Sequence, residues 1–178
     1  KPLSAREDLE KTRFDFSRQG GFVRAIEMCS GVGACRKRTE GTMCPSYMAT
    51  GEEEHSTRGR AVLLQAAISG RLPAEELASP RMFQALDLCL ECKGCKGECP
   101  ANVDMAKLKY ELLARYYDRH PVPLRSRLFG DVARWNRLAS RFPSLYNATL
   151  RNGLIRQMME KFLGIDRRRP LPPLAPQR

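Results

Sequence analysis

Residues 89–100 constrain what this chain can fold into more than any other stretch, and they read C-L-E-C-K-G-C-K-G-E-C-P. Cys89, Cys92 and Cys95 are separated by two residues each, and Cys99 follows after three more, directly before a proline. This C-x2-C-x2-C-x3-C-P spacing wraps a short loop around an iron–sulfur cluster, and where two clusters are present its fourth cysteine binds the other one. The motif therefore predicts a second group of cysteines elsewhere in the chain.

A degenerate copy of the motif lies upstream, at residues 29–45. Cys29 and Cys35 match its first and third cysteines, whereas Val32 stands where the second one would be. Cys44 comes directly before a proline, like the last cysteine of the first motif, but after an insertion of five residues. The chain therefore contains the same motif twice, with one cysteine missing from the upstream copy.

Because the two motifs are related, we expect each to lend its last cysteine to the other cluster. The predicted ligands of a [4Fe-4S] cluster are then Cys44, Cys89, Cys92 and Cys95. The second cluster has three predicted thiolate ligands, which are Cys29, Cys35 and Cys99. A [3Fe-4S] cluster, which lacks one corner of the cube, suits three thiolates best. The alternatives are a [4Fe-4S] cluster with a fourth ligand such as His55, and a second site that binds no cluster.

Four further residues are predicted to bind or surround a cluster or a partner's anion. Gly31 and Gly33 allow the backbone to approach a cluster closely and to donate amide hydrogen bonds to its sulfurs. Arg58 and Arg60 fall in the first turn of a predicted helix, where positive charge opposes the helix dipole. A nearby anionic cluster would explain this placement, and two solvated arginines would explain it as well. His55 is more often a surface or capping histidine than a ligand.

The seven cysteines occur only in these two groups, an odd number that suits metal ligation better than a secreted disulfide framework. We therefore expect a reducing, cytoplasmic compartment. A zinc-binding nucleic-acid module is disfavoured, because tetrahedral zinc prefers two separated C-x2-C pairs, and no nucleic-acid partner is predicted. With His55 and His120 as the only histidines and no Cys–His pair evident, no residue is a candidate catalytic acid, base or nucleophile.

Hydrophobic periodicity predicts helices around both motifs and no series of strands. The predicted helix N-caps are Ser56 or Thr57, then Ser79 before Pro80, and finally Asn102. The helix that leads into the second motif has a predicted apolar face of Met82, Phe83, Leu86 and Leu90. Each cysteine loop is therefore expected to lie between two helices of an all-α domain.

Composition divides the chain into four parts. We predict a lead-in from an upstream domain over residues 1–20, a cluster domain over 21–120, a helical extension over 121–165 and a linker rich in Pro and Arg over 166–178. The formal charge is +11, and residues 111–178 hold 14 Lys and Arg against 5 Asp and Glu. We expect these basic amphipathic helices to pack on the cluster domain or a neighbouring one, with a membrane surface as the alternative. The first residue is not Met and the end resembles a linker, so we expect an excerpt of a longer polypeptide.

The motifs together resemble the iron–sulfur segment of large FAD-linked oxidases similar to glycolate, D-lactate and D-2-hydroxyglutarate dehydrogenases. The resemblance rests on C-x-G-x-G-x-C-R-K, G-T-M-C-P-S-Y-x-A-T, H-S-T-R-G-R-A and D-L-C-L-E-C-K-G-C-K-x-E-C-P-x-N-V-D-M-A, and it covers roughly residues 20–130. It implies the α-helical ferredoxin fold, with two cluster-binding loops between helices. The C-x5-C step with an aliphatic residue in the middle also resembles the three-iron site of succinate dehydrogenase and fumarate reductase subunits.

The resemblance further implies a flavin domain with FAD upstream and a cysteine-rich domain downstream, both outside this chain. The expected function is electron transfer from the flavin, reduced by a 2-hydroxy acid, to a quinone, a cytochrome or another acceptor. The fragment would then serve a larger oxidoreductase without turning over substrate by itself, in the cytoplasm or peripherally at a membrane. The alternative is a separate iron–sulfur subunit of a quinone-linked complex of the succinate dehydrogenase or heterodisulfide reductase type.

Overall fold

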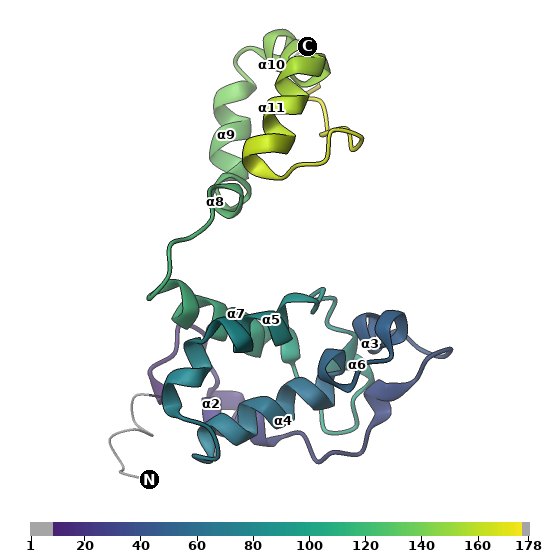
Figure 1. Ribbon diagram of the computed structural model, residues 1–178, viewed down its shortest axis with the longest axis vertical. Coiled ribbons are helices and arrows are strands. Elements are labelled where there is room, and N and C mark those ends of the chain that lie inside the picture. The colour runs from purple at the N-terminus through teal and green to yellow at the C-terminus, as the bar shows by residue number, and fades with distance from the viewer. Residues whose placement is uncertain (1–8, 176–178) are drawn as a thin grey trace. The chain divides into compact units, whose positions relative to one another are not determined.

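The computed structural model describes residues 9–175, and these residues form helices and no strand (Figure 1), which confirms the predicted all-α class. The chain divides into two units, Lys1–His120 and Pro121–Arg178. The first unit contains α2 (Phe22–Glu27), α3 (Pro45–Thr50), α4 (Thr57–Ile68), α5 (Pro80–Asp87), α6 (Gly94–Glu98) and α7 (Met105–Tyr117). Four short 3-10 turns join them, η1 (Ser17–Gln19), η2 (Ala34–Arg36), η3 (Glu53–His55) and η4 (Ala74–Ala78).

Helix α4 is the central element of the first unit. It begins at a predicted cap, because the Ser56 hydroxyl accepts the backbone N–H of Gly59 at 2.8 Å. Helices α2 and α5 and the turns η3 and η4 pack around it. Leu64 is fully buried within this packing. Gly70 follows the end of α4, and its φ of 82° is the left-handed conformation that glycine adopts readily after a helix.

The core of the first unit is a single apolar cluster that lies between the two cysteine loops. Its fully buried large side chains include Phe22, Ile26, Met43, Leu64, Leu86, Met105, Leu108 and Leu112. Burying one such side chain is worth about 1.5–3 kcal/mol relative to leaving it exposed. Several cysteines join the same cluster, so the packing that folds the unit also fixes where the thiols lie.

Residues 9–20 belong to this core, whereas the sequence placed the start of the domain at residue 21. Leu9 and Phe16 are buried. The carboxylate of Glu10 accepts the backbone N–H of Phe22 at 2.7 Å and that of Val23 at 3.1 Å, and so caps α2. The residue directly before α2 is Gly21, which has no side chain that could cap the helix. Glu10, in residues 9–20, supplies the cap instead.

Two details of the helices differ from the prediction. Asp104 caps α7 by accepting the N–H of Lys107 at 3.0 Å, whereas the predicted cap, Asn102, has a φ of 56° in the turn before it. Asparagine tolerates this left-handed conformation. The helix therefore begins two residues later, with Asp104 as its N-cap. Leu90 is 70% exposed, because α5 ends at Asp87 and the chain has already entered the cysteine loop.

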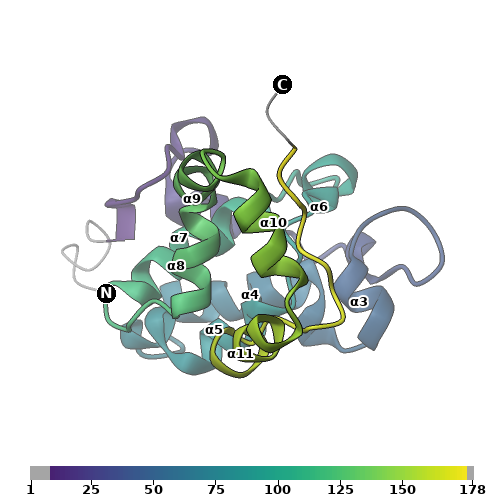
Figure 2. The same cartoon turned by 90° about the horizontal axis from the view of Figure 1, so that it is seen from above.

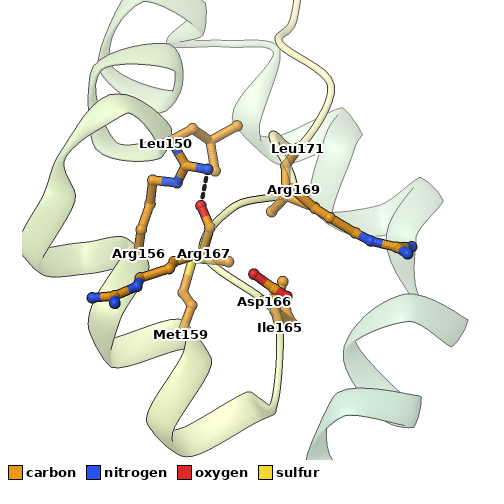
Figure 3. A pocket seen from close by; sticks show the side chains of 8 residues that line it. All are labelled: Leu150, Arg156, Met159, Ile165, Asp166, Arg167, Arg169 and Leu171. Atoms are coloured by element: carbon orange, nitrogen blue, oxygen red, sulfur yellow. Dashed lines mark hydrogen bonds between the residues drawn. The ribbon is translucent and has the colours of Figure 1, made fainter.

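The second unit consists of α8 (Leu124–Gly130), α9 (Val132–Ala139), α10 (Pro143–Arg151) and α11 (Gly153–Leu163), with α10 and α11 in contact (Figure 2). Pro143 begins α10, and Gly164 follows the end of α11 in the left-handed conformation. None of the side chains described in these helices is buried. A shallow pocket lies beside α11, where Arg156 donates to the carbonyl of Arg167 (Figure 3). No helix among residues 9–175 is long and apolar enough to span a membrane.

Candidate iron–sulfur centres

One cavity of the first unit is lined by cysteines from both motifs. Cys29 and Cys35 of the upstream motif and Cys99 of the downstream motif all face it. The cavity has about 270 Å³ of empty space, part of it open to solvent. The backbone N–H of Arg58, in the first turn of α4, donates to the Cys35 sulfur at 3.3 Å. The structure therefore brings together the three thiols that the exchange of last cysteines predicts, with an amide donor on one of them.

The remaining buried cysteines form a second group. A Cβ atom built on Gly94 of the downstream loop would lie 3.5 Å from the backbone nitrogen of Met43, the residue directly before Cys44. Cys44 and Cys95 are buried and Cys89 is half-buried. Cys92 is exposed at the outside of the loop between Cys89 and Cys95. Cys44 of the upstream motif is thus placed with the downstream motif.

Glu98 holds the Cys44 loop against the downstream motif. Its carboxylate accepts the backbone N–H of Thr42 at 2.6 Å and that of Met43 at 3.2 Å. Glu98 ends the short helix α6, directly before Cys99. The contact therefore connects the last cysteines of both motifs through one side chain, and it was not among the predicted site residues.

The backbones of the two cysteine loops repeat each other. Gly31 and Gly33, with φ of 77° and 80°, stand on either side of Val32. Glu91 and Lys93, with φ of 57° and 60°, stand in the same places around the middle cysteine of the downstream loop. Left-handed backbone is costly for non-glycine residues, so the downstream loop adopts this shape against the preference of its own residues. The comparison supports the alignment of Val32 with a cysteine.

Arg58 and Arg60 lie at different centres. Arg58 lines the cavity of Cys29 and Cys35 and pairs with Glu53 at 2.7 Å. Arg60 is 1% exposed, and one of its guanidinium nitrogens lies 3.8 Å from the Cys44 sulfur. Their placement in one helical turn thus directs one cation to each group of cysteines.

Lys109 is a second buried cation that the sequence reasoning missed. Its ammonium donates to the carbonyl of Cys89 at 2.8 Å and pairs with Glu91 at 2.9 Å, with only 8% of its side chain exposed. The signal was present in the sequence, because Lys109 lies four residues after Met105 and three before Leu112. It therefore falls on the apolar face of α7, where a charged residue needs a partner.

The structure places His55 away from the three-cysteine cavity. Its ring lies 3.0 Å from the Thr50 hydroxyl, and its backbone carbonyl accepts the Ser46 hydroxyl at 2.7 Å. His55 is not among the residues that line the cavity of Cys29 and Cys35. The His55 ring thus contacts the Thr50 hydroxyl at the end of α3 and takes no part in lining this cavity.

The pKa of Cys44 is shifted in the opposite direction from the pKa of Cys35, Cys89 and Cys95. Burial raises the pKa of Cys35, Cys89 and Cys95. Burial is also the largest influence on Cys44 and acts to raise its pKa. Hydrogen bonds from the Ser46 hydroxyl and the backbone, together with the charge of Arg60, nevertheless lower the pKa of Cys44 overall. The anionic form of Cys44, which is the form that binds metal, is therefore favoured by the surrounding protein.

The donor set fits iron–sulfur clusters. Soft thiolates are the ligands that such clusters require, and amide N–H groups directed at sulfur are typical of their surroundings. No three His, Cys, Asp or Glu side chains in the described part of the chain converge on one point to hold a single metal ion. The cysteines at the cavity surround a space, as a ligand larger than one ion needs.

The fold and the cysteine groups fit an iron–sulfur domain, and part of the chain is similar to a known family of such domains. Residues 28–104 match the family model described as 4Fe-4S dicluster domain. The chain is 28% identical over 195 residues to D-2-hydroxyglutarate dehydrogenase of Pseudomonas putida, a match that covers 92% of this chain and 19% of that protein. It is 24% identical over 204 residues to the Escherichia coli protein of the same name, covering 89% and 20%.

A third relative is the probable glycolate oxidase iron-sulfur subunit of Bacillus subtilis, 36% identical over 69 residues, or 38% of this chain and 15% of that protein. These matches confirm the predicted resemblance to the iron–sulfur segment of such oxidase-like proteins. The chain spans about a fifth of the length of the curated relatives it matches. No solved structure matches the chain.

Proposed function

We propose that this chain is the electron-transfer module of a larger FAD-linked oxidoreductase that oxidises a 2-hydroxy acid. The relatives are named as a dehydrogenase and as an oxidase iron-sulfur subunit, which supports an oxidoreductase context. When bound, iron–sulfur clusters carry single electrons at potentials between about −700 and +450 mV. The proposed donor is FAD in an upstream domain, and the proposed acceptor is a quinone or a cytochrome.

The observation that carries the proposal is that Cys99 of the downstream motif lines one cavity with Cys29 and Cys35 of the upstream motif. Cys99 faces the cavity of Cys29 and Cys35, while the residues directly before Cys44 donate to Glu98 of the downstream motif. We propose that all seven cysteines of the chain serve as ligands in this arrangement. A single structural metal would need only one such group, whereas two neighbouring groups in one core are suited to passing electrons between them.

The two proposed ligand sets follow from this geometry. A [4Fe-4S] cluster would be held by Cys44, Cys89, Cys92 and Cys95, and a [3Fe-4S] cluster by Cys29, Cys35 and Cys99. The absence of His55 from the cavity lining supports the three-iron form over a cube completed by that residue. Gly31, Gly33, Arg58 and Arg60 would bind or tune the clusters through backbone shape, amide donors and charge.

The second candidate function is a separate iron–sulfur subunit of a quinone-linked complex. It is favoured by the Bacillus subtilis relative, which is named as a subunit. The two candidates differ in whether the flavin domain and the cysteine-rich domain are parts of the same polypeptide. Size and flavin content of the purified protein would separate them. In both cases we propose a cytoplasmic protein, or one peripheral to a membrane, that does not bind nucleic acid.

Anaerobic purification tests the function directly. We expect a brown protein with iron and labile sulfide, and electron paramagnetic resonance signals from two clusters before and after reduction by dithionite. One signal should be present in the oxidised state, as for a three-iron cluster, and another should appear on reduction. A colourless protein that contains zinc and no labile sulfide would refute the proposal.

A pair of cysteine variants tests the exchange of ligands. Cys44→Ser should damage the cluster at Cys89, Cys92 and Cys95, although Cys44 belongs to the other motif in sequence. Cys99→Ser should damage the cluster at Cys29 and Cys35. Electron paramagnetic resonance of both variants reads the two clusters separately. If each variant instead affected the cluster of its own motif, the assignment would be wrong.

A further inference from the structure

Arg60 is a buried cation with an unusual set of partners. Its guanidinium donates to the backbone carbonyl of Ala85 at 2.9 Å and to the Ser46 hydroxyl at 3.1 Å, and its remaining nitrogen faces the Cys44 sulfur at 3.8 Å. The side chain is among the largest fully buried ones in the described residues, at 1% exposure. The first two partners are neutral, so they satisfy the hydrogen-bonding capacity of the guanidinium without neutralising its charge.

The other cations near the cysteines differ in this respect. Arg58 pairs with Glu53, and Lys109 pairs with Glu91. The charge of Arg60 contributes in small part to lowering the pKa of Glu54, but the Glu54 carboxylate accepts two hydrogen bonds from Arg81. None of the ion pairs within residues 9–175 includes Arg60.

A buried cation without a counter-charge is strongly unfavourable, so proteins keep one only where an anion compensates it. The sulfur of Cys44 is the group next to Arg60 that can become anionic. The guanidinium thus lies against one of the proposed ligands of the cluster at Cys44 and Cys89.

We propose that Arg60 is the buried counter-charge of the cluster ligated by Cys44 and Cys89, and that it raises the reduction potential of this cluster. The inference rests on the proposed function. Reduction adds one electron, and thus one negative charge, to a centre that already carries the charge of its thiolates. A fixed cation in a low-dielectric interior stabilises the reduced state more than the oxidised state. Arg60 acts through the cluster environment and is a positioning and tuning residue, not a catalytic one.

Arg58 and Lys109, the other two cations near the cysteines, each pair with a carboxylate, and Arg60 does not. Arg58 is 28% exposed and compensated by Glu53, so its effect on the cavity of Cys29 and Cys35 should be weak. Lys109 is compensated by Glu91 and should contribute little net charge. The uncompensated charge therefore belongs to one centre only, and its removal should change the potential of that centre alone.

A redox titration followed by electron paramagnetic resonance tests the inference on the anaerobically purified protein with both clusters. Arg60→Gln removes the charge and keeps a hydrogen-bonding side chain. We expect a lower midpoint potential for the cluster at Cys44 and Cys89 and an unchanged one for the other cluster. Arg60→Lys keeps the charge and loses the guanidinium geometry, and its potential should stay close to that of the unsubstituted protein.

Arg24→Gln is the matched control, because Arg24 is an exposed arginine on α2 that pairs with Glu27. It changes the net charge by the same amount and should move neither potential. The inference is overturned if Arg60→Gln leaves the potential in place, if Arg60→Lys lowers it as far as Arg60→Gln does, or if Arg24→Gln lowers it equally. If Arg60→Gln fails to retain the cluster, Arg60→Lys is the second measurement: a cluster retained at an unchanged potential, beside its loss in Arg60→Gln, supports the need for the charge, and a lowered potential or an equal loss of the cluster overturns the inference.

The two proposals fail in different ways. An unsubstituted protein without iron and labile sulfide would contradict the proposed function and, with it, the role of Arg60. Two clusters whose potentials are indifferent to Arg60 would contradict only the inference, and would leave electron transfer as the function of the chain.

Discussion

At the scale of single residues, the difference between the two cysteine loops reduces to one side chain. Val32 stands between two left-handed glycines, in the position that Cys92 occupies between Glu91 and Lys93. Both side chains are exposed, Val32 at 65%. The backbone around Val32 thus has the shape that presents a thiol in the other loop, and only the thiol is missing.

We therefore predict that Val32→Cys completes a four-thiolate site at Cys29, Cys35 and Cys99. The iron content should rise by about one atom per chain, and the signal of the oxidised three-iron cluster should disappear, because a cube with four thiolates can hold its fourth iron. Metal analysis and electron paramagnetic resonance measure both effects.

Val62→Cys provides the control for this substitution, since Val62 is also exposed, at 51%, but belongs to the body of α4. It adds an accessible thiol without the loop geometry and should change neither iron content nor signal. An unchanged iron content in Val32→Cys would mean that the site already holds four irons or none.

At the scale of elements, the contact between α4 and η3 positions the Cys35 donor and both arginines. Gly59 lies at this contact, in the first turn of α4. A Cβ atom there would overlap the backbone carbonyl of Glu53 and would lie 3.1 Å from the Cα of Glu54. Both obstacles are backbone atoms, which cannot rotate away as a side chain can.

Gly59→Ala should therefore destabilise the first unit, by about 1–3 kcal/mol as for an overpacked core, even though alanine is the better helix former by about 1 kcal/mol. Gly97→Ala is the matched control in α6, where a Cβ meets no atom within 4 Å, and it should stabilise by about 0.5–1 kcal/mol. Urea unfolding of both variants measures the sign. Stabilisation by Gly59→Ala would show that α4 and η3 are packed less closely than described.

The contact between Glu98 of α6 and the loop before Cys44 should contribute to stability in a way that depends on pH. The backbone N–H groups of Thr42 and Met43 donate to Glu98 and hold the pKa of its carboxyl below the ordinary value of 4.5. Because the folded-state pKa is depressed, the contribution of this carboxylate is present above pH 4.5 and is lost as the pH falls through the folded-state value.

Amide hydrogen exchange checks this prediction at the two donors. Protection of Thr42 and Met43, corrected for the intrinsic exchange rate at each pH, should fall as the pH is lowered below 4.5, and Glu98→Gln should remove this dependence. The amide of Met82 is the control, since it donates to the Ser79 hydroxyl, which does not titrate in this range. Equal loss of protection at Met82 would indicate general unfolding.

At the scale of the whole molecule, the division of the chain separates the cysteines from the basic helices. All seven cysteines and all buried side chains of the described residues lie before His120. The second unit exposes large apolar side chains such as Trp135, Phe142 and Phe162. Four helices without a buried residue gain little from packing, and short helices are marginal on their own in water.

We predict that a chain ending at His120 binds iron and labile sulfide in the same ratio as the full chain, because the first unit holds every ligand and the whole core. The segment from residue 121 onward, made alone, should be largely unfolded by circular dichroism. Loss of the clusters in the shortened chain would show that the second unit supports the first directly.

Features of the fold that depend on neighbouring residues could be predicted from the sequence, whereas contacts between residues distant in sequence could not. Cysteine spacing and the caps at Ser56 and Ser79 are read from neighbouring residues, and all appear in the structure. The role of Glu10 and Glu98 was invisible, since each carboxylate reaches amides that are distant in sequence. The sequence indicates that Arg60 lies in the first turn of a helix, where its charge opposes the helix dipole. Only the fold shows that it is buried beside Cys44.

The exchange of last cysteines has a consequence for the unfolded chain. A cluster bound by both Cys44 and Cys89 would be a covalent cross-link that closes a loop of about 45 residues containing α3, α4 and α5. For a disulfide, closing a loop of this length removes roughly 4 kcal/mol of chain entropy from the unfolded state. The second cluster would join Cys35 to Cys99 and close an overlapping loop. The two clusters would thus act as two cross-links that close overlapping loops of the same chain. Oxidative loss of either cluster should therefore increase the conformational entropy of the unfolded segment that the two loops share.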